Sequence, residues 1–385
     1  MSSLEVEIER ILPGGYGLAH SAGHTIFVSL AAPGDRLRVR VERQQGNVLF
    51  ATIEEILVAS PDRIEPPCPY FGRCGGCDFQ QLTYEKQLAA KAEIIRDCLH
   101  RIARLAEVPE IVVNPSLRDW RYRLRATWQI DQDERTIGYY ERGSRRVCDV
   151  ADCAVLVPQL QQTLERVRAT DWHEFPPGLK HLDVVAGENG VSLAPAFGEF
   201  ETAELELKIG DEIYSYSADA FFQVNPGLLA PLIEFALSDL RGEVAVDLYC
   251  GVGLFTLPLA RRFANVTGVE ANPIAVWFAR HNLQRAGLEN ARVLNAGVSE
   301  WIRKTALESD FVLLDPPRAG AESAVIKGIL DSRAKRVSYV SCDPATLARD
   351  LKKLFAGGYV IEALAAYDLF PQTHHVETVV RLHLG

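Results

Sequence analysis

The C-terminal part of the chain, from about residue 217 onward, alternates short apolar segments with longer segments of helical periodicity. The apolar segments are "VAVDLY", "NVTGVEA", "ARVLNA", "DFVLLDPP", "RVSYVSCD" and "YVIEALAAYDLF". Segments such as "LFTLPLARRF" and "PIAVWFARHNLQRAG" separate them and favour helices. Strands that alternate with helices form a parallel sheet with helices on both faces. We therefore expect a doubly wound α/β domain whose ligands bind at the carboxyl ends of its strands.

The turn after the first of these strands is typical of a nucleotide site. In "DLYCGVGLF", Gly251 and Gly253 follow the strand, and Glu270 ends the next strand, where a carboxylate can accept ribose hydroxyls. Thr256 occupies the place of the third glycine of a dinucleotide fingerprint. This disfavours a nicotinamide dinucleotide and favours a nucleoside without a pyrophosphate, namely S-adenosylmethionine. A plain strand-to-helix turn is the structural alternative.

Three later strand ends carry reactive side chains. Asp315 opens "DPPRAG", where a turn with a capping aspartate is the structural alternative. Cys342 precedes the expected helix "DPATLARDL", whose N-terminus would lower the pKa of the thiol. Buried inert cysteines are more common, but the position at the ligand edge favours a reactive thiolate. Glu377 lies between apolar residues at the start of the last strand, where desolvation would raise its pKa and suit it to act as a base.

Three of the eight cysteines lie within ten residues, in "CPYFGRCGGC". Cys68, Cys74 and Cys77 have the spacing C-x5-C-x2-C, which in such a chain indicates a metal or cluster rather than disulfides. Zinc and a four-iron cluster both need a fourth ligand, for which Cys148 and Cys153 are the candidates. Ligand spacing does not distinguish the two.

Residues 4–58 read as short alternating strands separated by turns such as "PGGYG" and "QQGN", which favours a small β-barrel. A structural cap and an OB-like RNA-binding barrel fit equally well. The net charge of −10 argues mildly against nucleic-acid binding, although arginines cluster in "RLRVRVER" and "RDWRYRLR".

The chain has no apolar run long enough to span a membrane, and the acidic N-terminus is unlike a signal peptide, so we expect a cytoplasmic protein.

Six segments together resemble the RNA uracil-5 methyltransferases, in the order and spacing of that family. They are "DAFFQVNPGLL", "DLYCGVGLFTLPLA", "GVEANPIAV", "LLDPPRAG", "VSYVSCDPATLARDL" and "HHVETVVRL". With the N-terminal and cysteine segments, the resemblance covers almost the whole chain. It implies methyl transfer from S-adenosylmethionine to C5 of a uridine in structured RNA, through a covalent adduct between a cysteine and C6 of the base.

The resemblance also implies roles for single residues. Cys342 is the nucleophile, Glu377 the base that removes the C5 proton, and Asp315 contacts the uracil or the cofactor. Gln223, Tyr249 and Glu270 bind S-adenosylmethionine. With the turn glycines, the expected cofactor site comprises Gln223, Tyr249, Gly251, Gly253, Glu270 and Asp315.

Two further implications concern the substrate and the cofactor. The resemblance places Arg123 and Arg125, from "RYRLR", near a uridine flipped out of its stack. Leu254 and Gly297 stand where the family has polar residues, which implies weaker binding of the cofactor. A lost hydrogen bond costs about 0.5–1.5 kcal/mol.

The resemblance selects a [4Fe-4S] cluster held by Cys68, Cys74, Cys77 and Cys153, and identifies the N-terminal barrel as a TRAM domain. It implies three domains. Residues 1–59 form the OB-like TRAM barrel, residues 60–79 and 110–216 a mixed α+β iron–sulfur middle domain, and residues 80–109 and 217–385 a Rossmann-like methyltransferase domain. The last is discontinuous because the helix after Thr83 is expected to pack with it.

Barrel and cluster together resemble the ribosomal-RNA branch of the family, so 23S rRNA is the expected substrate and tRNA the alternative. Methylation of a guanine or adenine amino group through D-P-P-R is another enzyme hypothesis, but it leaves Cys342 and Glu377 without a role. A non-catalytic RNA-binding protein is the hypothesis from a different class, and the intact set of Cys342, Asp315 and Glu377 disfavours it. We expect a monomer that binds RNA and neither DNA nor membranes.

Overall fold

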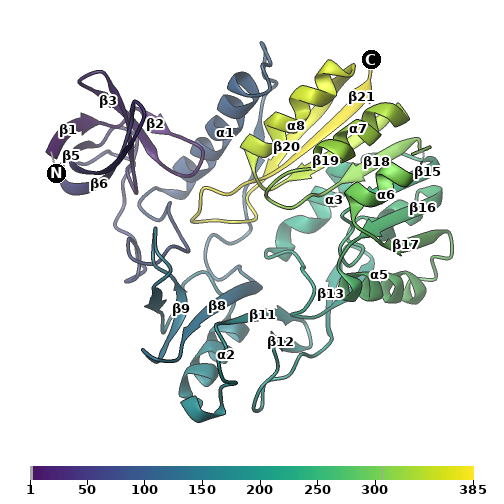
Figure 1. Cartoon of the computed structure of the whole chain (residues 1–385), viewed down its shortest axis with the longest axis horizontal. Helices are drawn as coiled ribbons and strands as arrows, with labels where there is room; N and C mark the ends of the chain where they lie inside the picture. The colour runs from purple at the N-terminus through teal and green to yellow at the C-terminus, as the bar shows by residue number, and fades with distance from the viewer. Residues whose placement is uncertain (1–2, 306) are drawn as a thin grey trace.

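The computed structural model describes residues 3–305 and 307–385. Its strands form three sheets and one separate hairpin (Figure 1). The N-terminal sheet has six strands in the order β1-β5-β6-β4-β3-β2, and all neighbours are antiparallel except β4 and β6. These strands are β1 (Ser3–Glu7), β2 (Arg10–Ile11), β3 (Gly17–Ser21), β4 (His24–Val28), β5 (Arg36–Gln45) and β6 (Val48–Val58). Alternation along β5 buries Leu37 and Val39 and leaves Arg36 and Arg40 exposed, as the sequence predicts.

The second sheet has five antiparallel strands in the order β10-β9-β8-β11-β12. They are β8 (Arg125–Asp131), β9 (Thr136–Tyr140), β10 (Val147–Asp149), β11 (His181–Gly187) and β12 (Gly190–Ala194). Helix α2 (Pro158–Ala169) packs on β11 and β12, and the buried Trp128 lies in the shared core. A short 3-10 helix, η1 (Trp172–Glu174), and the hairpin β13 (Leu205–Ile209) and β14 (Glu212–Tyr216) follow.

The third sheet has eight strands in the order β17-β16-β15-β18-β19-β21-β20-β7. They are β7 (Val112–Asn114), β15 (Gly242–Leu248), β16 (Phe263–Glu270), β17 (Ala291–Asn295), β18 (Phe311–Leu314), β19 (Arg336–Ser341), β20 (Tyr359–Tyr367) and β21 (Glu377–Leu384). β21 is antiparallel to both of its neighbours, whereas the other pairings are parallel. The expected α/β sheet is therefore present, with one reversed strand.

Helices cover both faces of this sheet. Leu313 on β18 points into a core shared with α3 and α5, while its neighbours Val312 and Leu314 point into a core shared with α1, α7 and α8. The helices are α1 (Tyr84–Arg101), α3 (Leu229–Leu237), α4 (Thr256–Ala260), α5 (Pro273–Arg285), α6 (Val298–Lys304), α7 (Ser323–Ser332) and α8 (Pro344–Ala356), with the 3-10 helix η2 (Pro226–Leu228) before α3. None of the helices in the described ranges is both long and apolar enough to cross a membrane.

Two features of this sheet go beyond the sequence pattern. β21 is reversed because residues 368–376 join it to β20 without a crossover helix, and such short connections link antiparallel strands. Helix α1 packs on α8, with Ile95 and Leu99 in the same core as Leu347 and Leu351. Figure 1 shows α1 between the N-terminal strands and the eight-stranded sheet.

Candidate active site

The expected catalytic side chains converge at the carboxyl edge of the eight-stranded sheet. Leu314 ends β18 and pairs with Tyr339 of β19, so Asp315 and Cys342 follow neighbouring strands. β21 runs the other way, and Ser341, the last residue of β19, pairs with Thr378. Glu377, the first residue of β21, therefore lies at the same edge, although it begins a strand instead of following one.

Glu377 is almost completely buried, with 2% of its surface exposed. Its Oε1 atom has no hydrogen-bond partner among the described residues. Burial raises the pKa of Glu377 well above that of an ordinary glutamate, and the nearby Asp315 raises it further. Burial likewise raises the pKa of Asp315. A buried carboxyl with an unsatisfied oxygen and a raised pKa is suited to accept a proton from a substrate.

The thiol of Cys342 is half-buried. Its pKa is raised to about 12, chiefly by burial and then by the carboxyl of Glu377. The prediction of a lowered pKa at the helix terminus is therefore wrong for the chain without ligands. Asp343 explains part of the difference, because its carboxylate caps α8 by accepting a hydrogen bond from the Thr346 amide at 2.8 Å, and its charge also raises the pKa of the thiol.

Arg318, the last residue of D-P-P-R, is a site residue to which the sequence analysis assigned no role. Its exposed guanidinium lowers the pKa of Cys342, of Glu377 and of His375. It thus opposes the three carboxyls that raise the pKa of the Cys342 thiol, namely Glu377, Asp315 and Asp343. The motif itself was the available signal, since an arginine three residues after a strand-end aspartate returns to the same edge.

The turn after β15 has the backbone expected of a cofactor loop. Gly251 and Gly253 have positive φ angles of 54° and 94°, which favour glycine. The carboxylate of Glu270 accepts hydrogen bonds from the Gly251 amide at 3.1 Å and from the Asn272 amide at 2.7 Å. Tyr249, with a φ of 64°, hydrogen-bonds to Glu322. These residues lie at the carboxyl ends of β15 and β16.

Asp315 and Gln223 are the other two residues expected to bind the cofactor. The Asp315 amide donates to the Leu248 carbonyl at 3.3 Å, which joins the ends of β18 and β15. Gln223 is 7% exposed in the segment that leads to α3. Leu254, which departs from the family pattern, is buried in the core beneath the turn. Gly297 is the exposed N-cap of α6.

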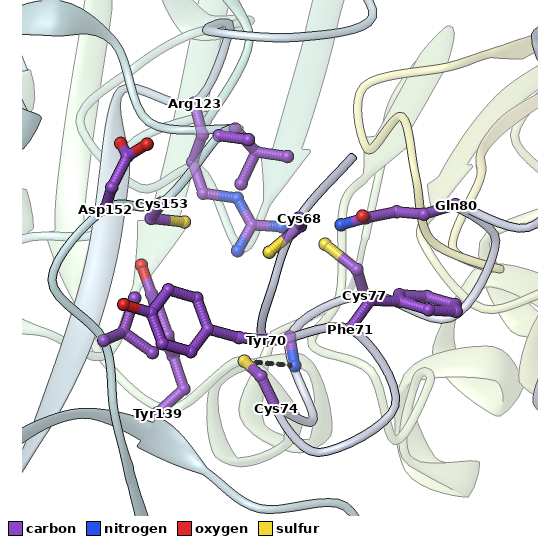
Figure 2. A pocket seen from close by; sticks show the side chains of 14 residues that line it. Cys68, Tyr70, Phe71, Cys74, Cys77, Gln80, Arg123, Tyr139, Asp152 and Cys153 are labelled. Atoms are coloured by element: carbon purple, nitrogen blue, oxygen red, sulfur yellow. Dashed lines mark hydrogen bonds between the residues drawn. The ribbon is translucent and has the colours of Figure 1, made fainter. Parts of the chain in front are cut away.

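A separate hollow collects four cysteines from two distant segments (Figure 2). Cys68, Cys74 and Cys77 come from the loop before α1, and Cys153 from the segment between β10 and α2. Cys148 is buried on β10 and does not line the hollow. The hollow is partly open to solvent. No group of three or more His, Cys, Asp or Glu side chains among residues 3–305 and 307–385 is arranged to hold a metal ion.

The two arginines expected near the uridine are engaged elsewhere in this structure. Arg123 lines the cysteine hollow, and its buried Nε atom lacks a hydrogen-bond partner among the described residues (Figure 2). Arg125 donates to the carbonyls of Ala220 at 2.7 Å and Ala218 at 2.8 Å, which fixes the segment before Gln223. Arg125 therefore fixes the backbone of the segment before Gln223.

Comparisons with known proteins identify the family to which the chain is similar. A family model described as tRNA (Uracil-5-)-methyltransferase matches residues 198–384. An uncharacterized RNA methyltransferase of Aquifex aeolicus is 31% identical over 426 residues, covering 99% of this chain and 98% of that protein. A 23S rRNA (uracil(1939)-C(5))-methyltransferase of Chromohalobacter salexigens is 35% identical, covering 98% of this chain and 88% of that protein.

A solved structure extends the likeness to the whole fold. The tRNA (uracil-54, C5)-methyltransferase of Pyrococcus abyssi, in complex with S-adenosyl-L-homocysteine, has a TM-score of 0.76 and 25% identity, covering 98% of this chain and 100% of that one. Relatives more than 30% identical span nearly the entire sequence. The chain belongs to the RNA uracil-5 methyltransferase family.

Proposed function

We propose that this protein transfers a methyl group from the co-substrate S-adenosylmethionine to C5 of a uridine in structured RNA. The observation that carries the proposal is the meeting of Asp315, Cys342 and Glu377 at one sheet edge, beside the glycine turn after β15. Membership of the family supports the reaction class. The residue roles and the covalent mechanism below are our proposal.

The reaction needs both a nucleophile and a base. The Cys342 thiolate adds to C6 of uracil, and the electron pair of the C5–C6 double bond moves onto the C4 carbonyl as an enolate. C5 then attacks the methyl carbon, and S-adenosylhomocysteine leaves with the electrons of the broken S–C bond. Glu377 takes the C5 proton, and those electrons reform the double bond as the C6–S bond breaks and returns the thiolate. Each bond that forms is matched by one that breaks.

The local electrostatics fit these roles. Glu377, with its raised pKa and unpaired Oε1, can hold the proton that it removes. Arg318 stabilises the Cys342 thiolate, and a cationic sulfonium nearby would act in the same direction. Asp315 lies between the cofactor turn and Cys342, where it can contact the uracil or the cofactor. We propose Gln223, Tyr249, Gly251, Gly253 and Glu270 as the remaining cofactor contacts, and keep Arg123 and Arg125 as predicted RNA contacts.

The N-terminal sheet supports RNA binding. Tyr16, Phe27 and Phe50 form a partly exposed aromatic group, with ring centroids of Phe27 and Phe50 5.4 Å apart. The guanidinium of Arg43 lies 3.7 Å from the centre of the Phe50 ring. Aromatic rings beside a cation stack unpaired bases. We propose this sheet as the OB-like TRAM barrel, residues 1–59.

We propose 23S rRNA as the substrate, because the Chromohalobacter salexigens relative bears that specificity and aligns with 98% of this chain. Transfer RNA is the second candidate, favoured by the likeness to the Pyrococcus abyssi enzyme. We further propose that residues 60–79 and 110–216 form a middle domain, except that β7 (Val112–Asn114) pairs with β20 in the eight-stranded sheet, and that residues 80–109 join residues 217–385. The packing of α1 on α8 supports the second assignment.

We propose that the cysteine hollow holds a [4Fe-4S] cluster. A thiolate set of four cysteines is the donor set that such clusters use. Cys68, Cys74, Cys77 and Cys153 all line the walls of one hollow, which would bring the four thiolates that such a cluster needs to one place. When bound, the cluster would cross-link the two segments, and no step of the methyl transfer uses its electrons.

Trapping the covalent adduct tests the proposed function. RNA that contains 5-fluorouridine cannot lose a proton from C5, so the cysteine should stay bonded to C6 after methyl transfer. Wild-type protein and Cys342→Ala are incubated with S-adenosylmethionine and with separate ribosomal and transfer RNA pools, then resolved on a denaturing gel.

A band that needs both the methyl donor and Cys342 supports the mechanism, and the pool that shifts identifies the RNA class. Cys98→Ala is the matched control, because Cys98 is a buried cysteine on α1 and does not follow a strand of the eight-stranded sheet. No band with either pool, together with labelled methyl groups on purines, would contradict the proposal.

A further inference from the structure

The loop that leads to Glu377, residues 368–376, is held by the segment that carries three of the cysteines, here called the cysteine segment (residues 60–82). The carboxylate of Asp78 accepts a hydrogen bond from the His374 amide at 2.7 Å and contacts the His374 Nδ1 atom at 2.5 Å. The Gln372 carbonyl accepts hydrogen bonds from the amides of Asp78 and Phe79, both at 3.0 Å. Four contacts thus join the two segments within a few residues of Glu377.

Other elements fix the same loop from the remaining sides. Gln87 of α1 accepts from the Gln372 amide and donates to the Gln372 side chain, both at 2.9 Å. Lys91 forms a fully buried ion pair with Asp368 at 2.5 Å. Tyr122 donates to the Pro371 carbonyl at 2.9 Å. The loop is therefore a rigid connection, whose shape is set by its neighbours.

We propose that Asp78 is a positioning residue for the proton-transfer step, and that it acts on Glu377 through His374. The inference rests on the proposed role of Glu377. The Oε1 atom of Glu377 makes no hydrogen bond with the described residues, so the place of the carboxyl depends on the backbone that precedes it. His374 lies three residues before Glu377 and is held from outside the loop by Asp78.

The cysteine segment would then help to position Glu377. This role involves no electron transfer. Asp78 follows Cys77 directly, so whatever orders the cysteine loop also orders the contact to His374. Displacement of a reacting group by about 1 Å can cost about 100-fold in rate. The step affected should be removal of the C5 proton, because Cys342 follows β19 and is not part of this loop.

The two chemical steps can be measured separately in a single turnover. RNA with tritium at uridine C5 reports proton removal, and a labelled methyl donor reports methyl transfer. In Asp78→Asn we expect methyl transfer within a few-fold of wild type and release of tritium slowed about 100-fold. Methylated RNA should then accumulate as a covalent complex with Cys342 on a denaturing gel. A merely structural defect would slow both steps together.

Gln81→Ala is the matched control. Gln81 is also buried in the cysteine segment, but its side chain donates to the Ala31 carbonyl of the N-terminal part at 3.2 Å and not to the loop. We expect neither step to change selectively in this variant. Iron and sulfide content, measured for each protein, shows whether the hollow is intact.

His374→Phe is the second variant, because it removes the ring contact to Asp78, keeps the amide contact and leaves the cysteine segment unaltered. If Asp78→Asn loses iron, the result with His374→Phe decides whether the contact between Asp78 and His374 affects removal of the C5 proton. Equal slowing of both steps, or unchanged tritium release, in His374→Phe would overturn the proposal. Failure of wild type to form the adduct with 5-fluorouridine RNA would instead overturn the proposed function, so the two failures are distinguishable.

Discussion

Cys342 shows how burial and charge compete at a single residue. Its pKa is raised to about 12, so at pH 7 the thiol of the ligand-free protein is almost entirely protonated. The thiolate fraction then rises about tenfold per pH unit up to that value. We predict that alkylation of Cys342 by iodoacetamide, followed by mass spectrometry of its peptide, keeps rising beyond pH 9, where an ordinary thiol of pKa about 8.5 levels off. A plateau below pH 9 in wild type would contradict this prediction.

Burial of the single residue Asp247 makes the stability of the fold depend on pH. It is fully buried on β15, accepts a hydrogen bond from the Thr256 hydroxyl at 2.5 Å, and its Oδ1 atom lacks a partner among the described residues. Burial raises its pKa to about 8, whereas an unfolded aspartate has a pKa of about 3.9. A raised pKa contributes stability that is full below about pH 4 and is lost as the pH rises through about 8. Asp247→Asn should therefore raise the Tm by an amount that grows from pH 5 to pH 8. A constant Tm difference would show that the carboxyl is already ionised.

At the scale of elements, the buried ion pair of Lys91 and Asp368 joins α1 to the 368–376 loop. Both side chains are fully buried, and Tyr84 also donates to Asp368 at 2.8 Å. Removal of one partner of a buried pair leaves an uncompensated charge and costs about 3–5 kcal/mol. Lys91→Met should lower the free energy of unfolding by about this amount in urea titrations. Lys86→Met is the control on the same helix, because its ion pair with Asp62 is exposed and should contribute less than about 1 kcal/mol. Equal losses in the two variants would mean that Lys91 is not charged in the fold.

The elements that the sequence predicts best are those whose pattern is local. The strand "VAVDLY" and the helix "PIAVWFARHNLQRAG" carry their own periodicity, and both are present as β15 and α5. The reversal of β21 has no local pattern, because it depends on which neighbour the strand pairs with. The raised pKa of Cys342 escapes prediction for the same reason: it arises from burial and from Glu377, which is 35 residues away in the chain. Arg318 could have been identified from the D-P-P-R motif alone, whereas the contact of Asp78 with His374 could be found only in the tertiary structure.

At the scale of the whole molecule, the cysteine segment lies between the N-terminal sheet and the catalytic sheet. Arg63 forms an ion pair with the buried Asp35 at 2.6 Å on one side. On the other side, Asp78 holds His374 of the 368–376 loop. The same short segment therefore contacts the N-terminal sheet that we propose to bind RNA and the loop that leads to the proposed proton acceptor. A cluster that orders this segment would influence both.

Removal of iron tests this connection. We predict that chelation of the reconstituted protein increases amide hydrogen exchange in residues 60–82 and also in residues 368–376, because the two segments share backbone hydrogen bonds. Exchange in β15, β18 and β19 should stay unchanged, since these central strands are buried between two layers of helices. The measurement is hydrogen exchange with mass spectrometry on holo and chelated protein, with Gln81→Ala holo protein as the control for loss of a contact to the N-terminal part alone. Faster exchange confined to residues 60–82 would show that the loop before Glu377 keeps its shape without the cluster, and that the hollow serves only local folding.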